Sequence, residues 1–138
     1  MPHALITGSA HRLGRHIALA LADAGYDIVL HAHDAHARLA AVEEEVRARG
    51  REVFSVEADL RSVKEIRDMA RVVAGRIERL DVLVNNAGVF PEAPFEEVTE
   101  DMWNLAVDVN TRAPFFLTQA VLPLLRAARG CVVNIVSA

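Results

Sequence analysis

Cysteine is nearly absent from this 138-residue sequence, which contains only Cys131. One cysteine cannot form an internal disulfide framework, so we expect a reducing compartment and a cytoplasmic location. Lysine is equally scarce, since Lys64 is the only one and the formal net charge is −4. A chain without a basic excess has little electrostatic attraction for a nucleic acid backbone, and we therefore expect no nucleic acid partner.

Long apolar runs are also lacking. The richest one, residues 113–125, is interrupted by two prolines, a threonine and a glutamine. It is shorter than the roughly 18 residues that a membrane-spanning helix requires. Residues 1–6 are too short for a leader and run straight into a glycine turn. These features predict a soluble protein with no membrane partner.

Hydrophobic residues make up 52% of the sequence, enough to bury the core of one domain but hardly of two. We therefore interpret residues 1–138 as a single domain. Short apolar runs of strand character alternate with helical patterns, the order expected of a parallel sheet with crossover helices. The expected strands are residues 4–7, 28–31, 53–56, 82–85 and 132–136, and the expected helices are 13–24, 37–49, a third from 62 onward, and 100–128.

The apolar runs are continuous rather than alternating, which favours strands covered on both faces. Because crossovers between parallel strands are right-handed in nearly all cases, the pattern predicts an α/β doubly wound parallel sheet of the Rossmann type. It would be incomplete, with five strands in the order 3-2-1-4-5. Ser62 with Glu65 predicts a capping box, and Thr99 is a second N-cap candidate. Pro114 is expected to kink the last helix or to lie at a break in it.

The first expected strand runs into Thr-Gly-Ser-Ala-His-Arg-Leu-Gly at residues 7–14, where the first helix begins. A strand that turns on glycine into a helix exposes unpaired N–H groups at the positive end of the helix dipole, which suits a phosphate. The spacing differs from Gly-x-Gly-x-x-Gly, because Arg12 stands at the usual middle glycine, and a turn without a ligand is the alternative. The candidate cofactor-binding residues here are Thr7, Gly8, Ser9, Arg12, Leu13 and Gly14.

Further candidate residues lie at the expected carboxyl ends of later strands, where open parallel sheets bind ligands. Each has an ordinary alternative, such as an Asx turn, a locally bonded asparagine or a serine that merely ends a strand. Their joint occurrence is more specific than any one of them. They are Asp59 and Leu60 after the third strand, Asn86, Ala87 and Gly88 after the fourth, Asn110 in the last helix, and Ser137 after the fifth strand.

Together these motifs resemble the short-chain dehydrogenase/reductase family, whose glycine signature is Thr-Gly-x-x-x-Gly-x-Gly. The family's most recognisable short motif, Asn-Asn-Ala-Gly, is intact at residues 85–88. With Arg12 at the middle position, the glycine turn resembles that of the pteridine reductase branch. With Ser137 at its end, the last strand resembles that of the broader group that includes 3-oxoacyl carrier-protein reductases. The resemblance implies an NAD(P)(H)-dependent oxidoreductase that transfers hydride to a carbonyl or to a pterin-like C=N bond.

The same resemblance implies a role for each candidate residue. In the family, the serine that corresponds to Ser137 donates a hydrogen bond to the substrate carbonyl, and the asparagine that corresponds to Asn110 helps hold a water in the proton relay. These two are the candidate catalytic residues. The acid that corresponds to Asp59 binds the adenine amino group. The small residues 87–88 let the ribose and nicotinamide lie against the main chain.

Residues 31–36 bear on the choice of cofactor. A carboxylate at the tip of the second strand holds the ribose hydroxyls of NAD, whereas a cation suits the 2′-phosphate of NADP. The tip position is Ala32, and His33 aligns with a histidine of pteridine reductase-like members, although Asp34 stands where they carry arginine. We expect NADP(H) rather than NAD(H), with His33 as a cofactor-binding residue. A metal site at His31 and His33 is disfavoured, because the spacing fixes no third ligand.

The family's catalytic Tyr-x-x-x-Lys does not occur in residues 1–138, whose only tyrosine and lysine are Tyr26 and Lys64. We therefore expect the N-terminal part of a longer reductase, which binds a nucleotide without turnover. The alternative is a non-catalytic dinucleotide-binding sensor or scaffold module, and an epimerase-like enzyme fits the glycine loop less well. We also expect a homo-oligomer, a dimer or a tetramer, formed through the apolar last helix with its Trp103, Phe115 and Phe116.

Overall fold

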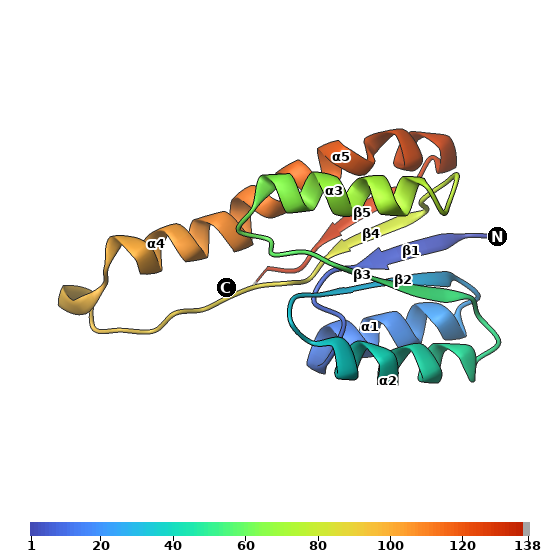
Figure 1. Ribbon diagram of the computed structural model, residues 1–138, viewed down its shortest axis with the longest axis horizontal. Helices are drawn as coiled ribbons and strands as arrows, with labels where there is room; N and C mark the ends of the chain where they lie inside the picture. Colours follow the sequence, from blue (N-terminus) through green and yellow to red (C-terminus); the bar gives the residue numbers. More distant parts are fainter. Residues whose placement is uncertain (137–138) are drawn as a thin grey trace.

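A five-stranded parallel sheet forms the centre of the protein in the computed structural model, which describes residues 1–136 (Figure 1). The strand order is β3-β2-β1-β4-β5, and every neighbouring pair is parallel. The predicted fold class and strand order are thereby confirmed. The strands are β1 (His3–Ile6), β2 (Asp27–Ala32), β3 (Val53–Glu57), β4 (Val82–Asn85) and β5 (Cys131–Asn134).

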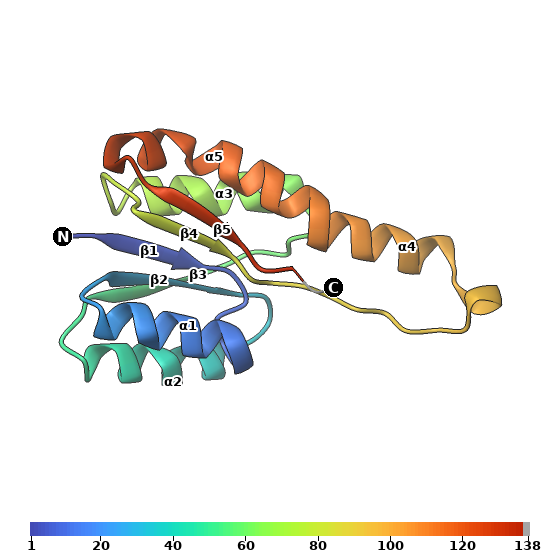
Figure 2. The ribbon, with the colours of Figure 1, turned by 180° about the vertical axis from the view of Figure 1, so that it is seen from behind.

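Helices cover both faces of the sheet, as Figures 1 and 2 show from opposite sides. One face carries α1 (Arg12–Asp23) and α2 (His36–Arg47), and the other carries α3 (Val63–Ala74) and α5 (Ala113–Ala128). Alternate strand residues point to opposite faces, so Leu5 packs toward α3 and α5, whereas Ile6 packs toward α1 and α2. Because both faces are covered, the inner strands read as continuous apolar runs.

A long helical rod lies along one side of the molecule and extends past the sheet (Figure 1). It consists of α4 (Glu100–Val107), a π-helical turn (Asp108–Arg112) and α5, and it follows a short 3-10 turn (Phe95–Glu97). Pro114 lies in the first turn of α5, directly after the π turn. Proline has no N–H to offer the carbonyl four residues earlier, and the helix accommodates this by widening. The rod stays helical here, so the disturbance expected at Pro114 takes the form of a π turn just before the proline and not of a break.

Both N-cap residues predicted from the sequence, Ser62 and Thr99, cap their helices. Ser62 accepts a hydrogen bond from the N–H of Glu65 at 3.2 Å, and Thr99 caps α4 in the same way. The second half of the predicted capping box is wrong. The Glu65 carboxylate accepts from the N–H of Asp59 at 3.2 Å, because the N–H of Ser62 already donates to the Asp59 carbonyl.

The strand predicted at residues 132–136 ends earlier, at Asn134. Its partner β4 stops at Asn85, which is in register with Asn134, so the ladder ends after one more hydrogen bond from Ile135 to Asn85. β5 lies at the edge of the sheet, and all four of its residues are exposed. Among residues 1–136, no helix combines the length and the apolar character needed to cross a bilayer.

Candidate functional site

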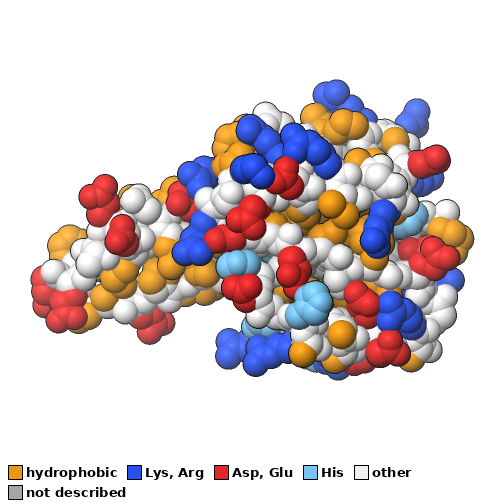
Figure 3. Space-filling view, viewed as in Figure 1, with side chains coloured by type: hydrophobic (Ala, Val, Ile, Leu, Met, Phe, Trp, Pro, Cys, Tyr) orange, Lys and Arg blue, Asp and Glu red, His pale blue; other side chains and the backbone are white. Residues whose placement is uncertain are grey.

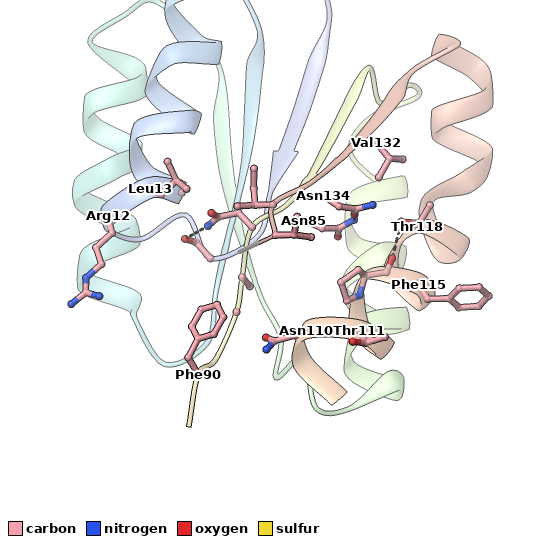
Figure 4. A pocket seen from close by; sticks show the side chains of 18 of the residues that line it. Arg12, Leu13, Asn85, Phe90, Asn110, Thr111, Phe115, Thr118, Val132 and Asn134 are labelled. Carbon is pink, nitrogen blue, oxygen red and sulfur yellow. Dashed lines mark hydrogen bonds between the residues drawn. The ribbon is translucent and has the colours of Figure 1, made fainter. Parts of the chain in front are cut away.

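A cleft of about 1460 Å³ opens at the carboxyl ends of β1, β4 and β5 (Figure 4). Its position is the one predicted for a ligand in an open parallel sheet. Segments far apart in the sequence line it together. They are Gly8 and residues 11–14 after β1, residues 85–88 and Phe90 after β4, Asn110 and Thr111 of the π turn, several side chains of α5, and residues 132 and 134–136.

The glycine turn packs so closely that two of its positions have no room for a side chain. Gly8 has φ +62°, and a Cβ there would lie 3.0 Å from Cα of Ala87. A Cβ on Gly14 would overlap the carbonyl oxygen of Gly8 and lie 2.6 Å from Nδ2 of Asn86. The first turn of α1 therefore begins directly against the glycine turn, with the positive end of its dipole at the cleft. This arrangement fits an anionic group such as a pyrophosphate.

Thr7 and Asn86 bind the ends of β1 and β4 to each other. The Thr7 hydroxyl oxygen accepts hydrogen bonds from the N–H groups of Asn86 at 3.0 Å and Ala87 at 2.9 Å. The Asn86 amide in turn donates to the carbonyls of Thr7 at 3.0 Å and Gly8 at 3.2 Å. Thr7 is buried and does not line the cleft. Its contacts hold the cleft's two walls together.

Ser9 is fully buried and faces β2. Its hydroxyl accepts a hydrogen bond from the N–H of His31 at 3.0 Å, and its own N–H donates to the His31 carbonyl at 2.9 Å. It therefore supports the glycine turn from behind, outside the cleft lining. Arg12 and Leu13 are exposed at the cleft rim. Arg12 has φ +52°, the left-handed conformation that explains why glycine is common at this position.

Asn110 lies across the cleft from the glycine turn, next to Phe90 (Figure 4). Its side chain makes two hydrogen bonds to Val89, accepting from the N–H at 2.9 Å and donating to the carbonyl at 2.7 Å. A Cβ added to Gly88 would lie 3.4 Å from the Asn110 amide oxygen. Asn110 thus fixes the segment after β4, which is a physical reason for an asparagine at this point of the π turn.

Three further predicted residues, His33, Asp59 and Leu60, do not line the cleft. His33 and Asp59 lie beyond the carboxyl ends of β2 and β3, on the same edge of the sheet. His33 Nε2 is 3.4 Å from the Asp34 carboxylate. The hydrogen bond from the Arg61 guanidinium lowers the pKa of Asp59 to about 2, so this carboxyl stays charged at neutral pH. Leu60 is buried, and Ser137 lies outside the described residues.

The two histidines considered for a metal site, His31 and His33, differ in their exposure to solvent. His31 is 2% exposed, whereas His33 is exposed. Over the described chain, residues 1–136, no three His, Cys, Asp or Glu side chains are grouped as metal ligands.

The sequence of residues 2–138 matches the family model described as short chain dehydrogenase. The chain belongs to the short-chain dehydrogenase family. Curated relatives include the 3-oxoacyl-[acyl-carrier-protein] reductase of Staphylococcus epidermidis, which is 34% identical over 135 residues. The corresponding reductase of Synechocystis is 32% identical over 135 residues. Both alignments cover 97% of this chain but 55% of the relative, so the chain spans about half the length of these proteins.

Solved structures of other short-chain dehydrogenases superpose closely on this one. A metagenomic short-chain oxidoreductase in complex with NADP has a TM-score of 0.92 at 37% identity, covering 99% of this chain and 62% of that one. An alcohol dehydrogenase from Thermococcus sibiricus complexed with 5-hydroxy-NADP has a TM-score of 0.91 at 29% identity, covering 97% and 57%.

Several residues of this short-chain dehydrogenase line the cleft without having been singled out from the sequence. Phe90 is 70% exposed, and the signal for it was an aromatic residue two positions after the Asn-Asn-Ala-Gly motif. Asn134 accepts a hydrogen bond from Asn85 at 2.9 Å across the ends of β4 and β5. Its signal was a polar residue near the end of an apolar strand. His11 and Thr118 also line the cleft, and no local pattern distinguishes them.

Proposed function

We propose that this chain forms the NADP(H)-binding part of a reductase that transfers hydride to a carbonyl group. The observation that carries the proposal is the cleft in which the glycine turn, residues 86–88 and Asn110 meet. The nicotinamide cofactor would supply the hydride. The residues of this chain would bind and orient the dinucleotide and hold the cleft walls at a fixed separation.

The pyrophosphate would lie against the N-terminus of α1. Backbone N–H groups in the first turn of a helix have no partner within the helix, and the helix dipole favours a negative charge there. The absence of side chains at Gly8 and Gly14 brings this helix end close to the turn, so the main chain itself can reach the phosphates. Ala87 and Gly88 present little side-chain bulk on the facing wall, which suits a flat ring.

Two features support NADP(H) over NAD(H). The tip of β2 carries Ala32 rather than an acid, and His33 and the cationic Arg38 lie close by in the sequence, with Asp34 as the carboxylate between them. The short-chain oxidoreductase with a TM-score of 0.92 is itself described as a complex with NADP.

The names of the curated relatives favour a carbonyl substrate, because they are 3-oxoacyl reductases. Ser137 would orient the substrate carbonyl, and Asn110 would support the proton relay. A pterin-like C=N substrate is the second candidate, and the observation in its favour is Arg12 on the rim of the cleft. An anionic or pterin substrate could accept hydrogen bonds from this guanidinium.

The first test is binding, with a matched pair of glycine variants. We expect NADPH to bind the wild-type chain more tightly than NADH, measured by calorimetry. Gly14→Ala should weaken NADPH binding by about tenfold or more, because the new methyl group overlaps the turn. Gly75→Ala is the control, since a Cβ there meets nothing closer than 3.5 Å and its φ is −76°. Unchanged binding by a folded Gly14→Ala variant would contradict the proposal.

The second test is turnover. We expect residues 1–138 alone to consume no NADPH with a reactive diketone, because Tyr26 and Lys64 are the only tyrosine and lysine and neither lines the cleft. Measurable consumption at 340 nm would refute this. A search of the gene for codons beyond 138 and of their translation for Tyr-x-x-x-Lys distinguishes the two functions. A reductase should contain Tyr-x-x-x-Lys and turn over, whereas a sensor or scaffold module should bind NADPH without turnover.

A further inference from the structure

His31 is the one buried histidine among the described residues, and both of its ring nitrogens are engaged. Its side chain leaves β2 on the face that carries α3, and the residue is 2% exposed. Nδ1 lies 3.1 Å from the N–H of Gly8, and Nε2 lies 3.0 Å from the carbonyl oxygen of Ala58. The ring therefore bridges the glycine turn after β1 and the segment after β3.

These two partners determine the protonation state of the ring. The Gly8 N–H can only donate, so Nδ1 must be an unprotonated acceptor. The Ala58 carbonyl can only accept, so Nε2 must carry the hydrogen. Only the neutral Nε2–H tautomer satisfies both contacts. A proton added to Nδ1 would face the N–H of Gly8 and remove that hydrogen bond.

The backbone of His31 makes the glycine turn dependent on this residue. Its N–H donates to the Ser9 hydroxyl at 3.0 Å, and its carbonyl accepts from the Ser9 N–H at 2.9 Å. Gly8 and Ser9 are thus both held by His31, one through the ring and one through the main chain. On the other side, Ala58 directly precedes Asp59. Protonation of the ring would therefore alter contacts to two segments, the glycine turn proposed to hold the phosphates and the residues proposed to hold the adenine.

We propose that His31 is a positioning residue that holds the glycine turn in its binding shape only while its ring is neutral, so that dinucleotide affinity falls when the ring is protonated. This inference rests on the proposed dinucleotide binding at the same turn. His31 does not line the cleft and acts through Gly8.

Burial and the charged groups around the ring determine the direction in which the pKa of His31 shifts. Burial is the largest influence and lowers the pKa of His31, and a nearby positive charge on His33 lowers it further. The Ala58 hydrogen bond and Glu57 act in the opposite direction, and the glycine turn itself carries no charged side chain at residues 7–10. A lowered pKa means that the turn is intact above the ordinary histidine value of about 6.5 and is lost as the pH falls through the lower value.

Two amide variants separate the two ring contacts. His31→Asn places an amide near the position of Nδ1 and can still accept from Gly8, whereas His31→Gln can reach Ala58 but not Gly8. We expect the NADPH dissociation constant of the wild-type chain to rise as the pH falls from 8 through the lowered pKa of His31, by about tenfold once the ring is protonated. His31→Asn should bind like the wild type at pH 8 with a flatter pH profile, and His31→Gln should bind about tenfold more weakly even at pH 8.

His16→Asn is the matched control, because His16 is exposed on α1 and does not line the cleft. It should keep the wild-type pH profile. The phosphate groups of NADPH titrate in the same range, but they do so equally in every variant. A profile of His31→Asn that matches the wild type would overturn the inference.

A readout without ligand separates this inference from the proposed function. Nitrogen NMR of the wild-type chain should show an unprotonated Nδ1 on His31 at neutral pH, and the Gly8 amide should exchange faster in His31→Gln than in His31→Asn. If no variant binds NADPH but these signals are as expected, the proposed function fails while the His31 contact stands. A protonated Nδ1 at neutral pH, or equal Gly8 exchange in both variants, refutes the inference whatever the ligand does. If the variants do not fold, the wild-type nitrogen spectrum across pH still decides the matter.

Discussion

At the scale of single residues, Arg12 combines strain with a position on the rim of the cleft. Its φ of +52° is a conformation that costs a residue with a Cβ roughly 1–2 kcal/mol. Within residues 1–136 its guanidinium forms no ion pair. A strained residue with an unpaired cation at a candidate site is more readily explained by ligand binding than by stability.

Replacing Arg12 by glycine should therefore separate the two effects. We expect Arg12→Gly to raise the free energy of unfolding by about 0.5–1 kcal/mol, because the gain from relieved strain exceeds the added freedom of the unfolded chain. In the complete enzyme it should weaken an anionic or pterin substrate while sparing the cofactor. Urea unfolding and steady-state kinetics measure these effects.

Arg129→Gly is the matched control for Arg12→Gly. Arg129 also has φ +52°, but it caps the far end of α5 and does not line the cleft. It should gain similar stability with no change in ligand affinity. If Arg12→Gly leaves substrate affinity unchanged, Arg12 is only a surface residue.

At the scale of elements, the π turn in the helical rod places Asn110 against the segment after β4. The widened turn precedes Pro114, and it directs the Asn110 side chain onto both main-chain polar groups of Val89. The helical pattern predicted the rod, and Pro114 predicted a disturbance in it, which the structure shows as a π turn. The pairing with Val89, 21 residues away, follows from how the rod packs beside β4.

Removing this contact should loosen one wall of the cleft. We expect Asn110→Ala to lower the free energy of unfolding by about 1–3 kcal/mol, since it leaves two main-chain groups of Val89 without their partner. NADPH binding should weaken as well. Asn104→Ala, at an exposed position of α4, is the control and should change stability by less than about 0.5 kcal/mol. Equal stability of the two variants would show that the Val89 contacts do not support the wall.

At the scale of the whole molecule, exposed apolar side chains gather on the helical rod. Trp103 is 67% exposed and Phe115 is 63% exposed, and the space-filling view shows hydrophobic and acidic side chains over the projecting end of the rod (Figure 3). Large aromatic residues exposed on one element are typical of an interface. The expected homo-oligomer would bury them.

Light scattering should therefore give a mass above that of the 15.1 kDa monomer. Trp103→Asp should shift the population toward monomer, because a charge at the centre of an apolar contact opposes association. Val72→Asp is the control, since Val72 is 49% exposed on α3, away from the rod's projecting end. A monomeric wild type at high concentration, or an equal shift in both variants, would count against this interface.

The sequence by itself determined the order of the strands, the glycine turn and the place where the last helix departs from regular α geometry. These follow from local periodicity, the handedness of crossovers and the special geometry of glycine and proline, which act over a few residues. Only the tertiary structure decided which polar side chains face the cleft. Thr7 and Ser9 turn inward to Asn86 and His31, and His31 reaches Gly8, because hydrogen bonds between separate strands depend on strand order and register rather than on neighbouring residues.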